Sequence, residues 1–187
     1  MLDHSTMVAN VLSWHDQASA QNLHDGQEWY ATASASAAAI ADASGLSHDA
    51  CVGIIAALSP RVRWATNLVW ATTVAHARAA GAIEAPAVST RSNRGLAWRI
   101  ACGEAPLDVM KGPKTRSFFA NIAGDERAVA VDVWAARAAE GYRDERAPTG
   151  KRYAAIADAY REAADQRGLS PRDLQACVWV AVRGHAY

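Results

Sequence analysis

Apolar residues recur along the chain at the three- and four-residue spacing of amphipathic helices, and no segment alternates like the strands of a hairpin. Glycines, prolines and hydroxyl residues interrupt this pattern at positions typical of helix ends. The pattern therefore predicts eight or nine helices and a turn over residues 141–150. The expected helices cover residues 4–23, 28–44, 48–59, 62–80, 91–103, 150–167 and 170–184, with two more inside residues 112–139.

The starts and ends of these helices follow capping chemistry. Ser47 and Ser170 stand where a hydroxyl can accept a backbone N–H of the first turn, and Pro171 occupies the first helical position after Ser170. Glycine follows several segments, as expected of a left-handed stop at the C-terminal end of a helix. These glycines are Gly45, Gly81, Gly103 and Gly168.

The composition also favours an all-α fold. Apolar residues make up 51% of the 187 residues, alanine is abundant, and residues that favour strands are scattered. A chain of this length suits one well-buried domain, and we expect residues 1–187 to form one. No apolar run approaches a membrane span, and residues 1–17 lack the basic flank and apolar core of a signal peptide. We therefore expect an intracellular, cytoplasmic protein with no membrane partner.

Cysteine and histidine give no sign of a metal or cofactor site. Cys51, Cys102 and Cys177 are isolated from one another in apolar helical segments, so we expect buried, reduced thiols. The six histidines show no paired spacing typical of metal ligands. We expect no metal and no cofactor. Three tryptophans in apolar helical runs are expected in the core: Trp70, Trp134 and Trp179.

Charge is distributed unevenly although the formal net charge is zero. Residues 1–58 hold six acidic residues and no lysine or arginine, whereas residues 59–127 hold ten basic residues and five acidic ones. Residues 128–187 are nearly balanced, with nine basic and eight acidic residues. Because local charge attracts phosphate, the basic middle is open to two interpretations: a nucleic-acid contact surface or an ordinary solvated face.

Lys114 follows Gly112-Pro113 at the expected start of a helix. The positive end of the helix dipole disfavours the charged amine there, so we expect a lowered pKa for Lys114, and partial burial would act in the same direction. A neutral amine is a nucleophile that can form a Schiff base. The free backbone N–H groups of the same turn can bind a phosphate.

Asp132 stands between two valines, also at an expected helix start. One interpretation is purely structural, because aspartate is a favourable N-cap. In the other, Val129, Val131 and Trp134 wall the carboxylate with apolar groups, and it acts as a base or stabilises developing positive charge. The two roles are compatible, since one oxygen can cap the helix while the other faces a cleft.

Four segments carry a family resemblance. The stretch "GPKT", the helix "RSFFANIAG" and the segment "AVAVDVWAARAA" follow one another, with Lys114 18 positions before Asp132. Upstream stands "IIAALSPRVRWATNLVWATTV". In this order the segments resemble the helix-hairpin-helix DNA glycosylase superfamily (HhH-GPD), the endonuclease III-like proteins, and among them a short, divergent phage-type member. The resemblance covers residues 50–140, a glycosylase-like core.

The chain departs from this family pattern at the hairpin. The family hairpin normally reads Leu-Pro-Gly-x-Gly, whereas the corresponding place here is "DVMKGP", with Gly112 as its single glycine. Trp134 stands where family members often have histidine, and the C-terminal cluster of four cysteines found in some members is absent. The hairpin is thus rebuilt relative to the family.

The resemblance implies two helical lobes with a cleft that receives a base flipped out of double-stranded DNA. It implies that Lys114 attacks C1′ of the flipped nucleotide and that Asp132 stabilises the sugar cation. The implied DNA-binding residues are Arg61, Arg63, Trp64, Lys111, Gly112, Thr115 and Arg116. The implied base pocket consists of Ser59, Asn67, Trp98 and Trp134. For each of these residues a surface or packing role is the alternative.

Three functions stay open on the sequence alone. The first is a DNA base-excision-type glycosylase, with or without AP-lyase activity, that acts on a damaged or modified base. The second is a phage group transferase that modifies a DNA base on the same fold. The third is a catalytically inactive derivative that binds DNA or a protein.

Overall fold

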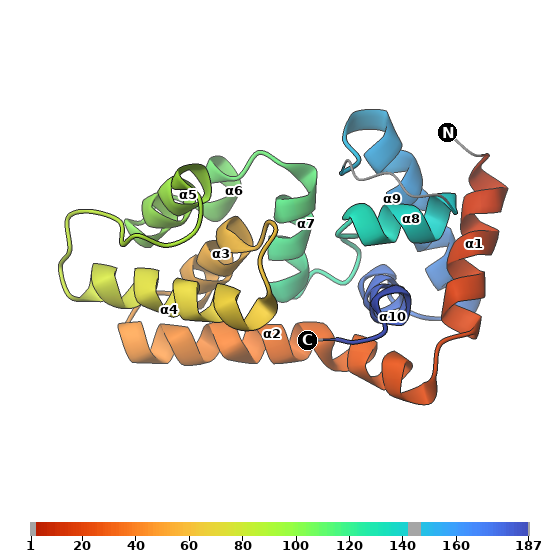
Figure 1. Ribbon diagram of the computed structural model, residues 1–187, viewed down its shortest axis with the longest axis horizontal. Helices are drawn as coiled ribbons and strands as arrows, with labels where there is room; N and C mark the ends of the chain where they lie inside the picture. Colours follow the sequence, from red (N-terminus) through yellow and green to blue (C-terminus); the bar gives the residue numbers. More distant parts are fainter. Residues whose placement is uncertain (1–2, 142–146, 187) are drawn as a thin grey trace. The chain divides into compact units, whose positions relative to one another are not determined.

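The computed structural model describes residues 3–141 and 147–186, and every regular element in them is a helix (Figure 1). The predicted all-α class is confirmed. Residues 142–146, half of the expected turn over 141–150, lie outside the described residues. The helices of the described part are α1 His4–Asp16, α2 Ala20–Ser44, α3 His48–Leu58, α4 Trp64–Ala79, α5 Arg91–Ala101, α6 Pro106–Val109, α7 Pro113–Ile122, α8 Val133–Glu140, α9 Gly150–Arg167 and α10 Pro171–Arg183.

Helix starts that depend on local capping chemistry occur where the sequence predicts them. The Ser47 hydroxyl accepts the backbone N–H of Ala50 at 3.2 Å and starts α3. The Ser170 hydroxyl accepts the backbone N–H of Asp173 at 3.0 Å and starts α10. Each cap satisfies an N–H group that has no partner within its helix. Helix α6 has no such signal and was not expected.

The expected break between residues 23 and 28 is wrong, because α2 runs without interruption through Gly26. A β-carbon at Gly26 would lie 2.4 Å from Cα of Cys177 in α10. The Cys177 thiol donates a hydrogen bond to the carbonyl of Leu23 at 3.3 Å across the same contact. Gly26 therefore permits close helix packing rather than ending a helix, and α1 ends instead at Asp16 with Gln17 as its cap.

The described helices form two compact units. Unit 1 comprises Met1–Tyr30 with Gly124–Ala186, and unit 2 comprises Ala31–Ala123. Helix α2 contributes to both, because the division falls between Tyr30 and Ala31.

Unit 1 is an alanine-rich packing of α1, α8, α9 and α10. Alanines of α8 and α9 let these helices approach closely, and two buried tyrosines fill the space between them. The Tyr160 hydroxyl donates to the carbonyl of Ala135 at 3.2 Å, and the Tyr153 hydroxyl donates to the carbonyl of Val129 at 2.6 Å. Burial, assisted by the negative charge of Asp132, raises the pKa of Tyr160 well above its ordinary value.

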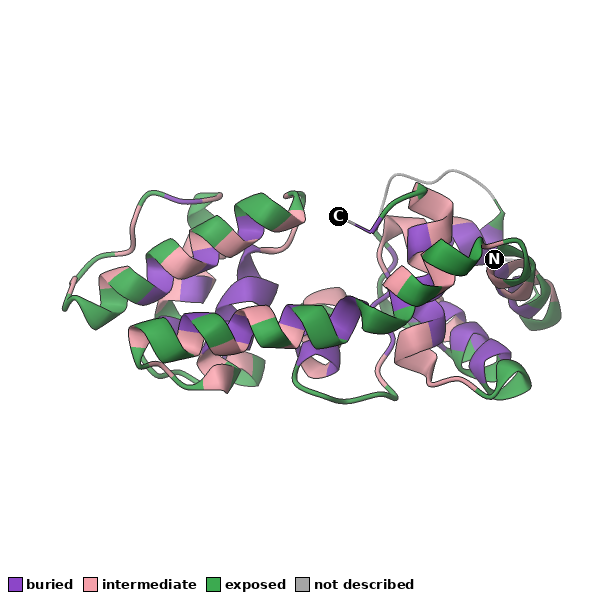
Figure 2. Ribbon diagram, turned by 90° about the horizontal axis from the view of Figure 1, so that it is seen from below, coloured by how far each residue is buried: buried purple, intermediate pink, exposed green. Residues whose placement is uncertain are grey.

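Unit 2 is organised around α3. Every residue from Cys51 to Leu58 is buried, and α4, α5, α6 and α7 pack against this helix (Figures 1 and 2). Its small residues allow the neighbours to come close: a β-carbon at Gly53 would lie 2.7 Å from Cγ of Pro106 in α6. Helix α3 ends at Leu58, and Ser59 is its C-cap.

Two expectations about buried side chains need correction. Cys51 and Cys177 are buried as expected, and burial raises the pKa of the Cys177 thiol to about 11, but Cys102 is exposed at the C-cap of α5. Trp70, Trp134 and Trp179, expected in the core, are only half-buried. Two of these rings pack against a cation, since the guanidinium groups of Arg137 and Arg183 lie 4.7 and 4.2 Å from the ring centroids of Trp134 and Trp179.

Among the described residues, no helix combines the length and the apolar character that crossing a bilayer requires.

The packing role of Gly26 predicts opposite effects for two glycine-to-alanine substitutions. Gly26→Ala places a methyl group 2.4 Å from the α10 backbone, so α2 and α10 must separate, and we expect a loss of about 1–3 kcal/mol in the free energy of unfolding. Gly95→Ala, inside α5 with no neighbouring atom within 4 Å, is the matched control, and its better helix propensity should add up to about 1 kcal/mol. Urea denaturation of both variants measures the difference, and similar effects at the two positions would contradict the packing role.

Candidate functional site

Lys114 lies in the first turn of α7, which starts at Pro113 with Gly112 as its N-cap. Its Nζ atom donates a hydrogen bond to the Ser59 hydroxyl at 3.1 Å and lies 4.7 Å from the ring centroid of Phe118. The side chain is half-buried. The structure thus brings together the predicted nucleophile and a serine of the predicted base pocket, which are 55 positions apart in the chain.

The Ser59 hydroxyl is oriented by the end of α3. It donates its proton to the carbonyl of Ala56 at 2.9 Å, which leaves its lone pairs to accept from Lys114. Since α7 packs directly against α3, the first turn of α7 is held beside this serine. The position of the Lys114 amine therefore depends on the packing of two helices and on one oriented hydroxyl.

The rebuilt hairpin between α6 and α7 is held by side chains. The Arg116 guanidinium donates to the carbonyls of Leu107 and Met110, and the Thr115 hydroxyl donates to the carbonyl of Gly112 at 3.0 Å. These bonds fix the connection of residues 110–112 without the second glycine of the family hairpin. Lys111 is exposed in this connection. Phosphate contacts by these residues stay a prediction.

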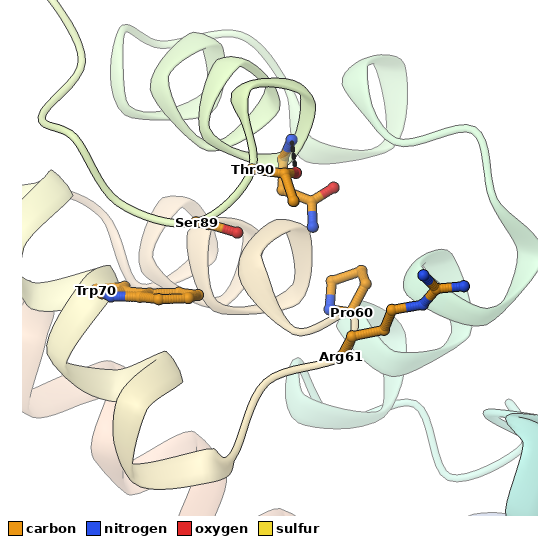
Figure 3. A pocket seen from close by; sticks show the side chains of 6 residues that line it. Pro60, Arg61, Trp70, Ser89 and Thr90 are labelled. Carbon is orange, nitrogen blue, oxygen red and sulfur yellow. Dashed lines mark hydrogen bonds between the residues drawn. The ribbon is translucent and has the colours of Figure 1, made fainter.

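The loop after Ser59 opens into a pocket of ≈ 460 Å³ in unit 2 (Figure 3). Arg61 lies in this loop with φ 61°, in the left-handed region that L-residues rarely adopt. Across the pocket Ser89 also adopts a left-handed conformation, with φ 53°. In the described part of the chain, these are the non-glycine residues with positive φ, and both line the same pocket. The lining residues are Pro60, Arg61, Trp70, Ser89, Thr90 and Asn93.

Sequence reasoning found only Arg61 of these six residues. The apolar neighbours of Trp70 indicate a core position, and residues 82–90 lie between the helices predicted over residues 62–80 and 91–103. One local signal was available, since Thr90 has the character of an N-cap, and its hydroxyl accepts the backbone N–H of Asn93 at 3.3 Å. The pocket is lined by both α4 and the start of α5, and this arrangement depends on tertiary packing that local sequence patterns do not contain.

Three of the predicted base-pocket residues belong to unit 2 and the fourth belongs to unit 1. Asn67 is only 1% exposed, and its Nδ2 donates to the carbonyl of Ile55 at 3.1 Å, so it ties α4 to α3. Trp98 is half-buried on α5, and Trp134 belongs to unit 1. Ser59 accepts the hydrogen bond from Lys114.

The two DNA-binding candidates at the start of α4 differ in exposure. Arg63 is exposed as the N-cap residue of α4, and Trp64, the first residue of that helix, is half-buried. Arg61 is exposed in the preceding loop. The loop from Arg61 to Arg63 thus places two guanidinium groups at the surface of unit 2 beside the pocket.

Asp132 is the N-cap of α8 in unit 1. Its Oδ1 accepts the backbone N–H groups of Trp134 and Ala135, both at 2.9 Å. Its Oδ2 accepts the indole N–H of Trp179 at 3.1 Å. The structural interpretation of this aspartate as an N-cap is thus observed, and its second oxygen also has a partner. Three donors fix the orientation of the carboxylate.

Trp179 connects Asp132 to the rest of unit 1. Its ring packs edge-on against Trp29, with centroids 5.8 Å apart, and the Arg183 guanidinium lies 4.2 Å from its ring centroid. Burial lowers the pKa of Arg183, and the negative charge of Asp132 opposes this shift. The carboxylate therefore acts on both a buried tyrosine and a half-buried arginine of its unit.

Comparison with known protein families covers almost the whole chain. A family model described as "Family of unknown function (DUF7178)" matches residues 1–186. The chain belongs to DUF7178. No curated protein and no solved structure matches the chain.

The DUF7178 match includes both Lys114 and Asp132, which lie in different compact units. Within residues 3–141 and 147–186, no group of three or more His, Cys, Asp or Glu side chains is placed to hold a metal ion.

The capping role of Asp132 predicts a graded loss of stability. Asp132→Ala removes the cap of α8 and leaves the Trp179 indole N–H without its acceptor, so we expect a loss of about 1–2 kcal/mol in the free energy of unfolding. Asp132→Asn keeps a capping oxygen, so its loss in the free energy of unfolding should be less than half of the loss for Asp132→Ala. Urea denaturation measures both, with Asp165→Ala, an exposed carboxylate on α9, as control. Equal losses for the alanine and asparagine variants would contradict the capping role.

Proposed function

We propose that the protein is a DNA base-excision glycosylase that acts on a damaged or modified base flipped out of the duplex, with Lys114 as its attacking amine. The observation that carries this proposal is the hydrogen bond between Lys114 and Ser59, because it joins two segments of the glycosylase-like pattern at one point of unit 2. The proposal also rests on the order of the motifs in residues 50–140 and on their resemblance to the helix-hairpin-helix DNA glycosylases.

The reaction requires a neutral amine at Lys114. Its Nζ lone pair forms a bond to C1′ of the flipped nucleotide while the C1′–N bond to the base breaks, and the departing base takes the electron pair and a proton. Opening of the sugar ring then gives an imine between Lys114 and C1′. Placing the lysine in the first turn of α7 favours this chemistry, because the positive end of the helix dipole disfavours the ammonium form.

Exposed cations of unit 2 support a DNA partner. Arg61, Arg63 and Lys111 are exposed, and none of them forms an ion pair within the described residues. By contrast, Arg99 is paired with Glu104, and Arg116 is bonded to main-chain carbonyls. The unpaired cations are free to contact phosphates near the Lys114 turn.

Asp132 has a proposed role in the same reaction, in which its carboxylate stabilises positive charge on the sugar. A carboxylate fixed by three donors suits this task, since it needs no reorientation as charge develops. The same three bonds also favour a second candidate function. A non-catalytic DNA-binding derivative would retain Asp132 as an N-cap and Lys114 as a partner of Ser59.

Borohydride trapping separates these two functions. With an oligonucleotide that contains an abasic site, the wild-type protein should form an imine that borohydride reduces to a stable protein–DNA adduct, and Lys114→Ala should reduce the yield at least tenfold. Lys151→Ala, which removes an exposed lysine of α9 in unit 1, is the matched control and should keep the adduct.

Two results would overturn the glycosylase. One is an adduct that persists in Lys114→Ala. The other is a wild-type protein that neither forms an adduct nor releases a base from a panel of damaged and phage-type modified DNAs. Accumulation of an enlarged base in nucleoside mass spectra would instead favour the group transferase.

A further inference from the structure

The pocket beside Ser59 has the size of a ligand site. Its ≈ 460 Å³ falls within the range of roughly 300–1,000 Å³ that small-molecule sites occupy. It is built from three separate parts of unit 2: the loop after α3, the middle of α4 and the first turn of α5. None of its residues other than Arg61 has a role in the proposed reaction.

Two polar side chains that line this pocket have no hydrogen-bond partner in the part of the chain that the structure describes. Among the described residues, none hydrogen-bonds to the side-chain amide of Asn93 or to the hydroxyl of Ser89. Figure 3 shows the Ser89 hydroxyl directed into the space between Trp70 and Pro60. Asn93 lines the same pocket. An asparagine amide offers one donor and one acceptor side by side, which matches the edge of a nucleobase. These groups are therefore available to a planar ligand with alternating donors and acceptors.

Trp70 supplies an aromatic surface for the same ligand. Its ring is half-buried and extends from α4 into the pocket, as Figure 3 shows. Tryptophan rings stack on any base, because every base presents a π-face. The indole N–H has no partner among the described residues, so no hydrogen bond holds the ring away from the pocket.

Arg61 places a positive charge at the opposite side of the pocket from Trp70 (Figure 3). Its exposed guanidinium has no carboxylate partner in the described part of the chain and can contact a phosphate. Both Arg61 and Ser89 reach the pocket from a left-handed backbone, which costs free energy in L-residues and is typical of functional positions. The lining thus offers an aromatic face, a base-edge donor and acceptor, and a phosphate contact in one space.

We propose that this pocket binds a single unstacked nucleobase of DNA, with the base on Trp70 and its edge on Asn93 and Ser89, and its phosphate at Arg61. The identity of the ligand as DNA rests on the proposed function, but the pocket needs no catalysis by Lys114. DNA is favoured over a free nucleotide because the pocket wall starts at Pro60, the residue after the serine that bonds Lys114, and exposed Arg63 lies beyond Arg61.

Fluorescence anisotropy with two labelled duplexes of equal length tests this site, one duplex fully paired and the other with a single bulged base. Wild type should prefer the bulged duplex. Trp70→Ala should weaken binding of the bulged duplex roughly tenfold, and of the paired duplex less than twofold, because only the unpaired base loses its stacking partner. Trp70→Phe should restore most of the affinity, and Asn93→Ala should cause a severalfold loss on the bulged duplex alone.

Controls separate this site from general effects and from the proposed reaction. Trp14→Ala removes an exposed tryptophan of α1 in unit 1, and Arg78→Ala removes an exposed cation of α4 outside the pocket, and neither should change the preference. The Lys114→Ala variant should still prefer the bulged duplex, even if it forms no adduct with borohydride. Failure of the base site can therefore be distinguished from failure of the proposed reaction. No preference in wild type, or equal losses on both duplexes for Trp70→Ala and Asn93→Ala, would overturn the site.

Discussion

Complete burial of α3 is the constraint on which unit 2 depends. Eight consecutive residues, Cys51–Leu58, have no exposed face, so α4, α5, α6 and α7 must all pack around them. Small residues such as Gly53 make this possible, since a larger side chain would meet Pro106 of α6. A helix enclosed in this way carries polar groups only at its ends. The C-terminal end is where Ser59 bonds Lys114, and where Pro60 and Arg61 form one wall of the pocket. The proposed chemistry and the proposed base site therefore share one structural origin.

Helix starts hold most of the remaining candidate chemistry. Lys114 lies in the first turn of α7, Asp132 caps α8, and Thr90 caps α5 beside the pocket. At each of these places, backbone N–H groups that have no partner within the helix lie near a charged or polar side chain. In unit 1 both carboxylate oxygens of Asp132 have donors, because they accept hydrogen bonds from two backbone N–H groups and from the indole N–H of Trp179. In unit 2 the Thr90 hydroxyl accepts the backbone N–H of Asn93, whereas the side chains of Ser89 and Asn93 have no partner among the described residues.

Local chemistry explains what the sequence could predict. Ser47 and Ser170 act as caps where expected, because a cap depends only on residues within one helical turn. Gly26 was misjudged because its role depends on the backbone of Cys177, which is distant in the sequence. Trp70 was placed in the core for the same reason: its apolar neighbours along the chain do not reveal that α4 and α5 leave a space beside it. The motif order suggested Lys114 and Ser59 as parts of one site, but their hydrogen bond became visible only with the packing of α7 on α3. For Asn67 the alternative packing role is observed, since its side chain ties α4 to α3.

The central claim is that the end of α3 and the helix starts around it form a DNA-binding surface. Hydrogen–deuterium exchange of the full chain, with and without an excess of a duplex containing one bulged base, tests it most directly. Three segments of unit 2 should exchange more slowly with DNA: residues 59–63, residues 89–93 and the first turn of α7. The exchange of peptides from α9 in unit 1 should not change with DNA, and these peptides serve as the internal reference. Unchanged exchange in all three segments under conditions where the duplex is bound would contradict the account.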